Sequence, residues 1–156
     1  MPKPIIFIAI ANDANQTLKN LPLEVKKIRS ALEEAEKKGL VEIITRSNAT
    51  IDEIFNVFQD SRYQNRISVF HFAGHANAWQ LLLEDNQRGE VKADGSGLIP
   101  FLGRQIGLQL VFLNGCSSEK QGHRLNEVGV PLVIGTAEAI VDEVAQLLAA
   151  RFYRGI

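Results

Sequence analysis

Residues 67–76 read ISVFHFAGHA, a mostly apolar run that ends in small residues and a histidine. The part from Ile67 to Phe72 predicts a strand. Four other short apolar runs predict further strands, at Ile5–Ala11, Leu40–Thr45, Leu108–Leu113 and Val130–Ile134. The first of these four has no polar alternation and is rich in isoleucine, which is typical of a strand buried on both faces of a sheet.

Helical patterns lie between these runs. Pro22 suits the first turn of a helix, and Gly39 is placed to end it. The apolar residues of this segment recur every three or four positions and form one stripe: Leu21, Val25, Ile28, Leu32 and Ala35. Before the next helical pattern, Thr50 and Glu53 have the spacing of a capping box, in which each side chain bonds the other residue's backbone N–H.

The remaining segments complete an alternation of strands and helices. The sequence pattern predicts helices at residues 98–106 and at about 138–152, and a hairpin at residues 80–92. Strands that alternate with helices are typical of an α/β domain whose sheet is mainly parallel. Because the chain has 156 residues, we expect residues 1–156 to form a single domain.

Charge and cysteine content narrow the possible partners and chemistry. Lys and Arg number 17 and Asp and Glu number 18, so a net charge of −1 offers no general attraction to nucleic acid or anionic membranes. The single cysteine excludes an intrachain disulfide and a zinc site built on several thiolates. The apolar stretch at residues 4–11 is far shorter than the ~20 residues of a membrane span. We expect a cytoplasmic protein with neither nucleic acid nor membrane as a partner.

Two loops of the expected sheet carry residues with catalytic chemistry. Functional residues of parallel sheets gather beyond the carboxyl ends of the strands, and there His75 follows the third strand and Cys116 the fourth. An imidazole beside a thiol can generate and hold the reactive thiolate. The backbone N–H groups of Cys116 and Ala76 could stabilise a developing oxyanion. The competing interpretation is a buried structural cysteine, which behaves as a small apolar residue.

The other two histidines compete for the role of base. His71 lies within the third predicted strand, where a hydrogen-bonded core histidine is the better interpretation. His123 lies in the loop or helix after Cys116, and the sequence does not fix its direction. We therefore prefer His75 as the base, because it leaves the end of a strand.

Two acidic residues lie near the start of the last predicted helix. Asp142 and Glu143 favour the positive end of a helix dipole, which is the simpler interpretation. Alternatively, one carboxylate lies in a pocket for a basic substrate side chain, where it would pair with a guanidinium.

Several of these stretches resemble one known family, the CHAT domain. The similar stretches are Val69–Ala76 (VFHFAGHA), Leu81–Asp85 (LLLED), Leu110–Glu119 (LVFLNGCSSE), Val130–Thr136 (VPLVIGT), Ala139–Glu143 (AIVDE) and Phe152–Arg154 (FYR). The CHAT domain is a branch of the caspase-like cysteine peptidases. The resemblance covers nearly the whole chain and implies a caspase-hemoglobinase α/β fold, a three-layer sandwich around a mainly parallel sheet.

The resemblance also implies an activity and roles for single residues. It implies a cysteine endopeptidase that hydrolyses peptide bonds without a metal or cofactor. His75 matches the catalytic histidine of the family and Cys116 its nucleophile. Asp142 falls where some relatives place an acid that receives a basic substrate side chain. The chain departs from many members in having Ala76 where they have glycine.

The biological setting follows from the same resemblance. Many TPR-linked members carry Trp-Pro where this chain has Ala139-Ile140, which fits the short prokaryotic branch better. Those short members often form the effector part of larger signalling or defence proteins. The resemblance therefore implies a regulated effector in bacterial signalling or defence, excised from a larger multidomain protein. Its partners would be a protein or peptide substrate and regulatory domains outside this chain.

Two other functions remain open on the sequence. The same fold could serve as a non-catalytic interaction module that binds partners through the strand-end cleft or self-associates. A flavodoxin-like domain that binds a small ligand is the weaker alternative. The first loop, Ala11–Asn20, lacks the glycine-rich cradle that holds nucleotide phosphates.

Overall fold

The strands that the structure describes form one parallel sheet. The computed structural model describes residues 1–10, 21–47, 49–73, 97–114, 119–135 and 142–155. Within them, the strands are Ile5–Ile10 (β1), Glu42–Ser47 (β2), Ile67–Ala73 (β3), Leu110–Asn114 (β4) and Leu132–Ile134 (β5). Their order is β2-β1-β3-β4-β5, and each neighbouring pair runs parallel. The prediction of an α/β domain with a mainly parallel sheet is confirmed.

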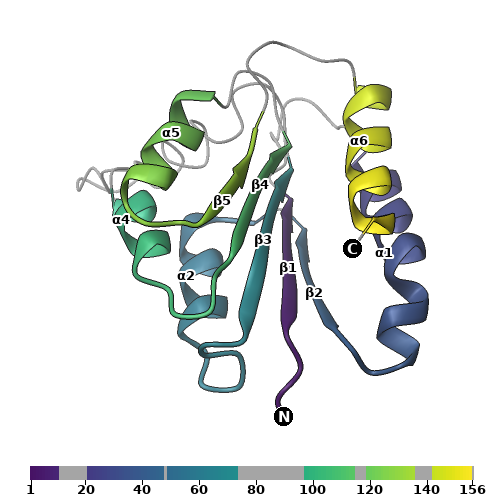
Figure 1. Cartoon of the computed structure of the whole chain (residues 1–156), viewed down its shortest axis with the longest axis horizontal. Coiled ribbons are helices and arrows are strands. Elements are labelled where there is room, and N and C mark those ends of the chain that lie inside the picture. The colour runs from purple at the N-terminus through teal and green to yellow at the C-terminus, as the bar shows by residue number, and fades with distance from the viewer. Residues whose placement is uncertain (11–20, 48, 74–96, 115–118, 136–141, 156) are drawn as a thin grey trace.

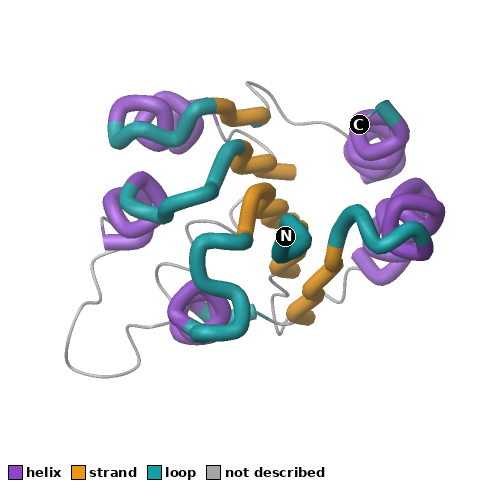
Figure 2. Tube along the Cα trace, turned by 60° about the horizontal axis from the view of Figure 1, so that its bottom comes forward, coloured by secondary structure: helices purple, strands orange, loops and turns teal. Residues whose placement is uncertain are grey.

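Helices cover both faces of this sheet and complete three layers. The described helices are Leu21–Lys37 (α1), Ile51–Gln59 (α2), Leu98–Gly103 (α4), Glu119–Glu127 (α5) and Asp142–Arg154 (α6). Helices α1 and α6 lie side by side on one face, and α2, α4 and α5 lie on the other (Figures 1 and 2). No helix among the described residues has the length and apolar character to span a membrane.

The sheet separates two apolar cores, and β1 contributes to both. Every residue of β1 is buried. Side chains 5, 7 and 9 join the core beneath α2, α4 and α5, whereas side chains 6, 8 and 10 join the core beneath α1 and α6. This alternation is what a strand requires, because successive side chains point to opposite faces. The predicted burial of the first strand on both faces is confirmed.

Local signals in the sequence mark several helix ends correctly. The Thr50 hydroxyl accepts a hydrogen bond from the Glu53 backbone N–H at 3.2 Å, and the Glu53 carboxylate accepts one from the Thr50 N–H at 2.9 Å. This is the predicted capping box. Gly39 follows the end of α1 with a φ of +70°, a conformation that glycine adopts without strain.

Other boundaries differ from the predictions by two or three residues. Strand β2 begins at Glu42 because the Leu40 N–H still bonds the Ala35 carbonyl at the end of α1. Helix α4 ends at Gly103, and Gly107 beyond it has a φ of +93°, which no helix continues. Strand β5 begins at Leu132 and is shorter than predicted. The predicted hairpin at residues 80–92 lies outside the described residues.

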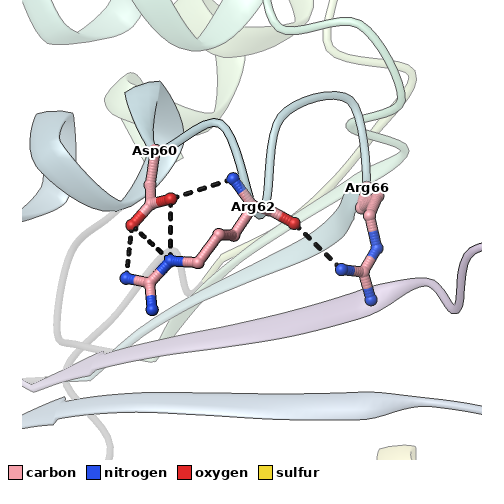
Figure 3. A network of polar contacts seen from close by, with 3 residues as sticks. All are labelled: Asp60, Arg62 and Arg66. Atoms are coloured by element: carbon pink, nitrogen blue, oxygen red, sulfur yellow. Dashed lines mark hydrogen bonds and ion pairs between the residues drawn. The ribbon is translucent and has the colours of Figure 1, made fainter.

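A polar cluster closes the turn between α2 and β3, at the amino end of the strands. The Asp60 carboxylate accepts hydrogen bonds from the Arg62 backbone N–H at 2.9 Å and from the Arg62 guanidinium at 2.6 to 3.1 Å (Figure 3). These hydrogen bonds lower the pKa of Asp60 to about 2. Arg66 donates to the Arg62 carbonyl at 2.9 Å and to Glu42 at 2.6 Å. The cluster therefore fixes how the chain enters β3.

Candidate functional site

The carboxyl ends of β3 and β4 lie beside each other in register. The last described pair of the two strands joins Ala73 to Asn114. The predicted site residues follow at once, since His75 and Cys116 each come two residues after this pair. His75, Ala76 and Cys116 themselves lie outside the described residues. The two strand ends that carry them are part of the described structure, and they are neighbours as predicted.

A buried polar network lies at this same end of the sheet. It joins Glu24 of α1, His71 of β3, Asn114 of β4 and Tyr153 of α6, all at most 4% exposed. His71 Nδ1 lies 3.0 Å from the Tyr153 hydroxyl, and His71 Nε2 lies 2.9 Å from Glu24 Oε1. The Asn114 side-chain amide donates to Glu24 Oε1 at 2.6 Å and to the Ala145 carbonyl at 3.2 Å. Four segments far apart in the sequence therefore meet at one point.

One assignment of donors and acceptors satisfies the hydrogen bonds from Tyr153 through His71 to Glu24. An ionised carboxylate only accepts hydrogen bonds, so His71 Nε2 and the Asn114 amide both donate to Glu24. In the tautomer that carries its proton on Nε2, the imidazole offers Nδ1 as an acceptor, and the Tyr153 hydroxyl donates to it. Asn114 uses both amide hydrogens, which fixes the orientation of its side chain. The hydrogen bonds of the network therefore depend on one another, because the direction of each one sets the donor or acceptor left for the next.

The carboxyl group of Glu24 is buried, and two features of its surroundings favour a negative charge on it. Glu24 lies in the first turn of α1, where the exposed N–H groups form the positive end of the helix dipole. Two donors, from His71 and Asn114, reach its carboxylate. Lys27, one turn along α1, donates to Gln146 at 3.1 Å and so connects α1 to α6 beside the network. Burial, followed by the charge of Glu24, raises the pKa of the Tyr153 phenol, which keeps this hydroxyl protonated.

One polar atom of the network has no hydrogen-bond partner among the described residues. Asn114 Oδ1 is buried, and no atom of the described residues donates a hydrogen bond to it. A buried acceptor without a donor costs about 1–3 kcal/mol. An apolar residue at this position would avoid that cost but would also remove the donor to Glu24 and the donor to the Ala145 carbonyl, so the two effects on stability oppose each other.

The other two histidines of the chain lie in different surroundings. His71 is fully buried and bonded at both ring nitrogens, which confirms the predicted core histidine. His123 lies on α5, with its side chain 72% exposed and Nε2 3.6 Å from Glu119 of the same helix. The sequence left loop or helix open at His123, and the structure shows a helix. His71 cannot serve as an accessible base, because no part of it reaches solvent.

Asp142 is the first residue of α6, near the helix start as predicted. Its side chain lies outside the described residues, and Glu143 beside it is exposed. Among the residues that the structure describes, no group of three or more His, Cys, Asp or Glu side chains is placed to hold a metal ion.

Sequence reasoning missed Glu24, Asn114 and Tyr153 as members of a polar network. One signal could have found the first of them: Glu24 precedes Ile28 by four residues and Leu32 by eight, so it falls on the buried stripe of its own helix. An acidic residue at a core position is almost never fully buried unless it is paired. Its partners were not readable, because they are 47 and 90 residues away.

Comparison with known proteins agrees with this architecture. No curated protein matches the sequence. The family model described as the CHAT domain matches residues 2–156, essentially the whole chain. CHAT is a caspase-like peptidase family, and a five-stranded parallel sheet flanked by helices is consistent with a caspase-like fold. This chain is therefore a member of the CHAT domain family.

Proposed function

We propose that this CHAT domain is a cysteine endopeptidase in which His75 and Cys116 form the catalytic pair. The observation that carries the proposal is the register of β3 and β4, which pairs Ala73 with Asn114. His75 and Cys116 follow this pair by the same two residues. A base and a nucleophile at equal offsets beyond the ends of neighbouring parallel strands support a dyad, which requires the two side chains to lie within hydrogen-bond reach of each other.

The faces of the two strands support the same pairing. On β3, Phe70 and Phe72 join the core beneath α2, while Ala73 joins the core beneath α1 and α6. On β4, Val111 and Leu113 join the first of these cores, whereas Phe112 joins the second. By this alternation, positions 71 and 73 of β3 belong to the α1 and α6 face, and so do positions 112 and 114 of β4. His75 and Cys116 follow positions 73 and 114 by the same two residues. We therefore expect the imidazole and the thiol on one face.

The proposed mechanism uses only groups of this chain and a water molecule. His75 holds the thiolate of Cys116, whose sulfur attacks the peptide carbonyl carbon. The N–H groups of Cys116 and Ala76 bind the oxyanion, the C–N bond breaks, and His75 gives its proton to the leaving amine. Water then attacks the thioester while His75 takes a proton from it. The carboxylic acid product leaves, and the thiolate of Cys116 is regenerated.

The direct test is cleavage of a peptide library by the wild type and by Cys116→Ala and His75→Ala. Both variants should lose cleavage by at least about a hundredfold, since each removes one member of a unit. His123→Ala is the matched control, because its ring is exposed on α5 and should leave cleavage unchanged. Cleavage that survives Cys116→Ala would disprove the mechanism. A folded wild type that cleaves no peptide would instead favour the non-catalytic interaction module.

We further propose that Asp142 receives a basic side chain of the substrate. The position of Asp142 at the start of α6 and the resemblance of residues 139–143 to the family support this role. Asp142→Lys should abolish any preference for Arg or Lys before the cleaved bond, because like charges repel. Glu143→Lys, the exposed neighbour, is the control. An unchanged preference in Asp142→Lys would remove this residue from the pocket.

The same resemblance supports a setting for the activity. We propose a cytoplasmic effector of bacterial signalling or defence whose cleavage is regulated by domains or partner proteins outside this chain. The similarity of residues 5–12 and the charged helix after them to short prokaryotic members supports it. Cleavage by the isolated chain at a low, unregulated rate, raised by its natural partner, is the expected result. A rate that no partner changes would contradict the regulation.

A further inference from the structure

We propose that Glu24, His71 and Asn114 form a positioning network that holds the ends of β3 and β4, and through them His75 and Cys116, in their reactive arrangement. This inference rests on the proposed function. Its residues act by positioning His75 and Cys116, and they do not contact the substrate themselves. None of the three reaches solvent to any useful extent, since all are at most 4% exposed.

The first step is the place of the network along the chain. Asn114 is the last residue of β4 and stands two residues before Cys116, and His71 stands four residues before His75. Each is therefore attached to one of the two loops through a few backbone bonds. A displacement of either strand end passes directly into the loop that it carries.

The second step is what the network ties together. Through Glu24 and Ala145, the side chain of Asn114 connects the end of β4 to both α1 and α6. Through Glu24 and Tyr153, His71 connects β3 to the same two helices. One oxygen, Glu24 Oε1, accepts hydrogen bonds from both strands, so the ends of β3 and β4 are held relative to the same atom of α1.

The third step is the kind of force involved. Hydrogen bonds are directional, so a network with matched donors and acceptors holds one arrangement, whereas apolar contacts tolerate small slides. Small displacements matter at a reactive site, because a shift of about 1 Å costs a factor of about a hundred in rate. Asn114 makes both of its described side-chain hydrogen bonds through the amide N–H groups, to Glu24 and to Ala145, and both are directional contacts of this kind.

The test compares Asn114→Leu with the wild type in peptide cleavage and in alkylation of the thiol. Cys116 is the single cysteine, so iodoacetamide reports on it alone. The Asn114→Leu variant should lose roughly ten- to a hundredfold in kcat with KM within about twofold. Its pH of half-maximal alkylation should move from the wild-type value toward the ~8.5 of a free thiol. Glu24→Leu should behave alike, and Glu24→Gln, which keeps an acceptor oxygen, should recover most of the loss.

Two controls separate positioning from general loss of stability. Asn56→Leu makes the same substitution on the exposed face of α2, and Ile54→Val weakens the core on the opposite face of the sheet. Neither should change the alkylation profile. Where Asn114→Leu does not fold, Asn114→Ser replaces it, because serine is too short to reach Glu24 and Ala145.

The outcomes distinguish this inference from the proposed function. A folded Asn114→Leu with wild-type kcat and wild-type alkylation profile overturns the positioning network, and so does an equal loss in Ile54→Val. A wild type that cleaves no peptide, yet shows the alkylation shift in Asn114→Leu, disproves the peptidase and supports the network. If the wild-type thiol is alkylated with the pH dependence of a free thiol, both the peptidase and the positioning network are disproved.

Discussion

Replacing Tyr153 with phenylalanine should cost stability at neutral pH and progressively less at alkaline pH. The substitution keeps the buried ring and removes only the hydroxyl that lies 3.0 Å from His71 Nδ1. The loss of this hydrogen bond leaves a buried ring nitrogen without a donor, which costs about 1–3 kcal/mol. We expect the free energy of unfolding of Tyr153→Phe to be lower by that amount near pH 7.

The alkaline part follows from the raised pKa of Tyr153. Burial, and then the charge of Glu24, raise this pKa above the value of about 10 that tyrosine has in the unfolded chain. Above pH 10 the unfolded state therefore binds fewer protons than the folded state, and stability falls as the pH rises. For one group the slope approaches about 1.4 kcal/mol per pH unit. The phenylalanine variant has no such group at this position, so the difference between the two proteins should shrink by about 1 kcal/mol between pH 10 and pH 11.

Urea unfolding followed by circular dichroism, at pH values from about 7 to 11, measures both quantities. Tyr63→Phe is the matched control, because Tyr63 is the only other tyrosine and lies half-buried under the Arg62 guanidinium. The control should keep the alkaline slope that Tyr153 produces. A difference between Tyr153→Phe and the wild type that stays constant up to pH 11 would refute the burial and the hydrogen bond on which the reasoning depends.

Two shorter predictions concern the two ends of α2. Thr50→Ala should lower the free energy of unfolding by about 1 kcal/mol, because it removes the acceptor of the α2 capping box, and Thr50→Ser should restore most of it in the same urea experiment. The contribution of Asp60 to stability should be fully present above about pH 4 and should disappear as the pH falls through about 2, because hydrogen bonds from Arg62 lower its pKa. Titration of the Asp60 carboxyl by NMR checks this, and an ordinary pKa near 3.8 in the wild type, unchanged in Arg62→Ala, would contradict it.

The fold was predictable because its signals are local or periodic. The apolar runs placed every strand of the described sheet, and the Thr50–Glu53 spacing placed a helix start. Boundaries were less accurate wherever a helix cap extends into the next element, as at Leu40, whose N–H bonds back to Ala35. Helix α5 was missed as a definite helix because its sequence is polar on most of its surface and only Gly122 and Leu125 are buried.

The candidate site was predictable only in part, and the reason is distance along the chain. The prediction that His75 and Cys116 follow neighbouring strands needed only the strand order, which the β3–β4 pairing bears out. Periodicity says nothing about which polar groups meet across the sheet. Glu24 finds its partners 47 and 90 residues away, so the network became visible only when the helices were placed.

The buried Oδ1 of Asn114, which has no partner among the described residues, leads to an expectation that separates the effect of this residue on stability from its effect on activity. Asn114→Leu loses two donated hydrogen bonds but also removes a buried acceptor to which no described residue donates, so these two effects on stability oppose each other. The effect on activity has no opposing contribution, because leucine makes no directional bonds to Glu24 and Ala145 and so does not hold the end of β4 in place. A structural residue loses stability and activity together when it is replaced. A positioning residue of this kind should lose activity by much more than its loss of stability predicts, and the comparison with Ile54→Val at equal stability measures that excess.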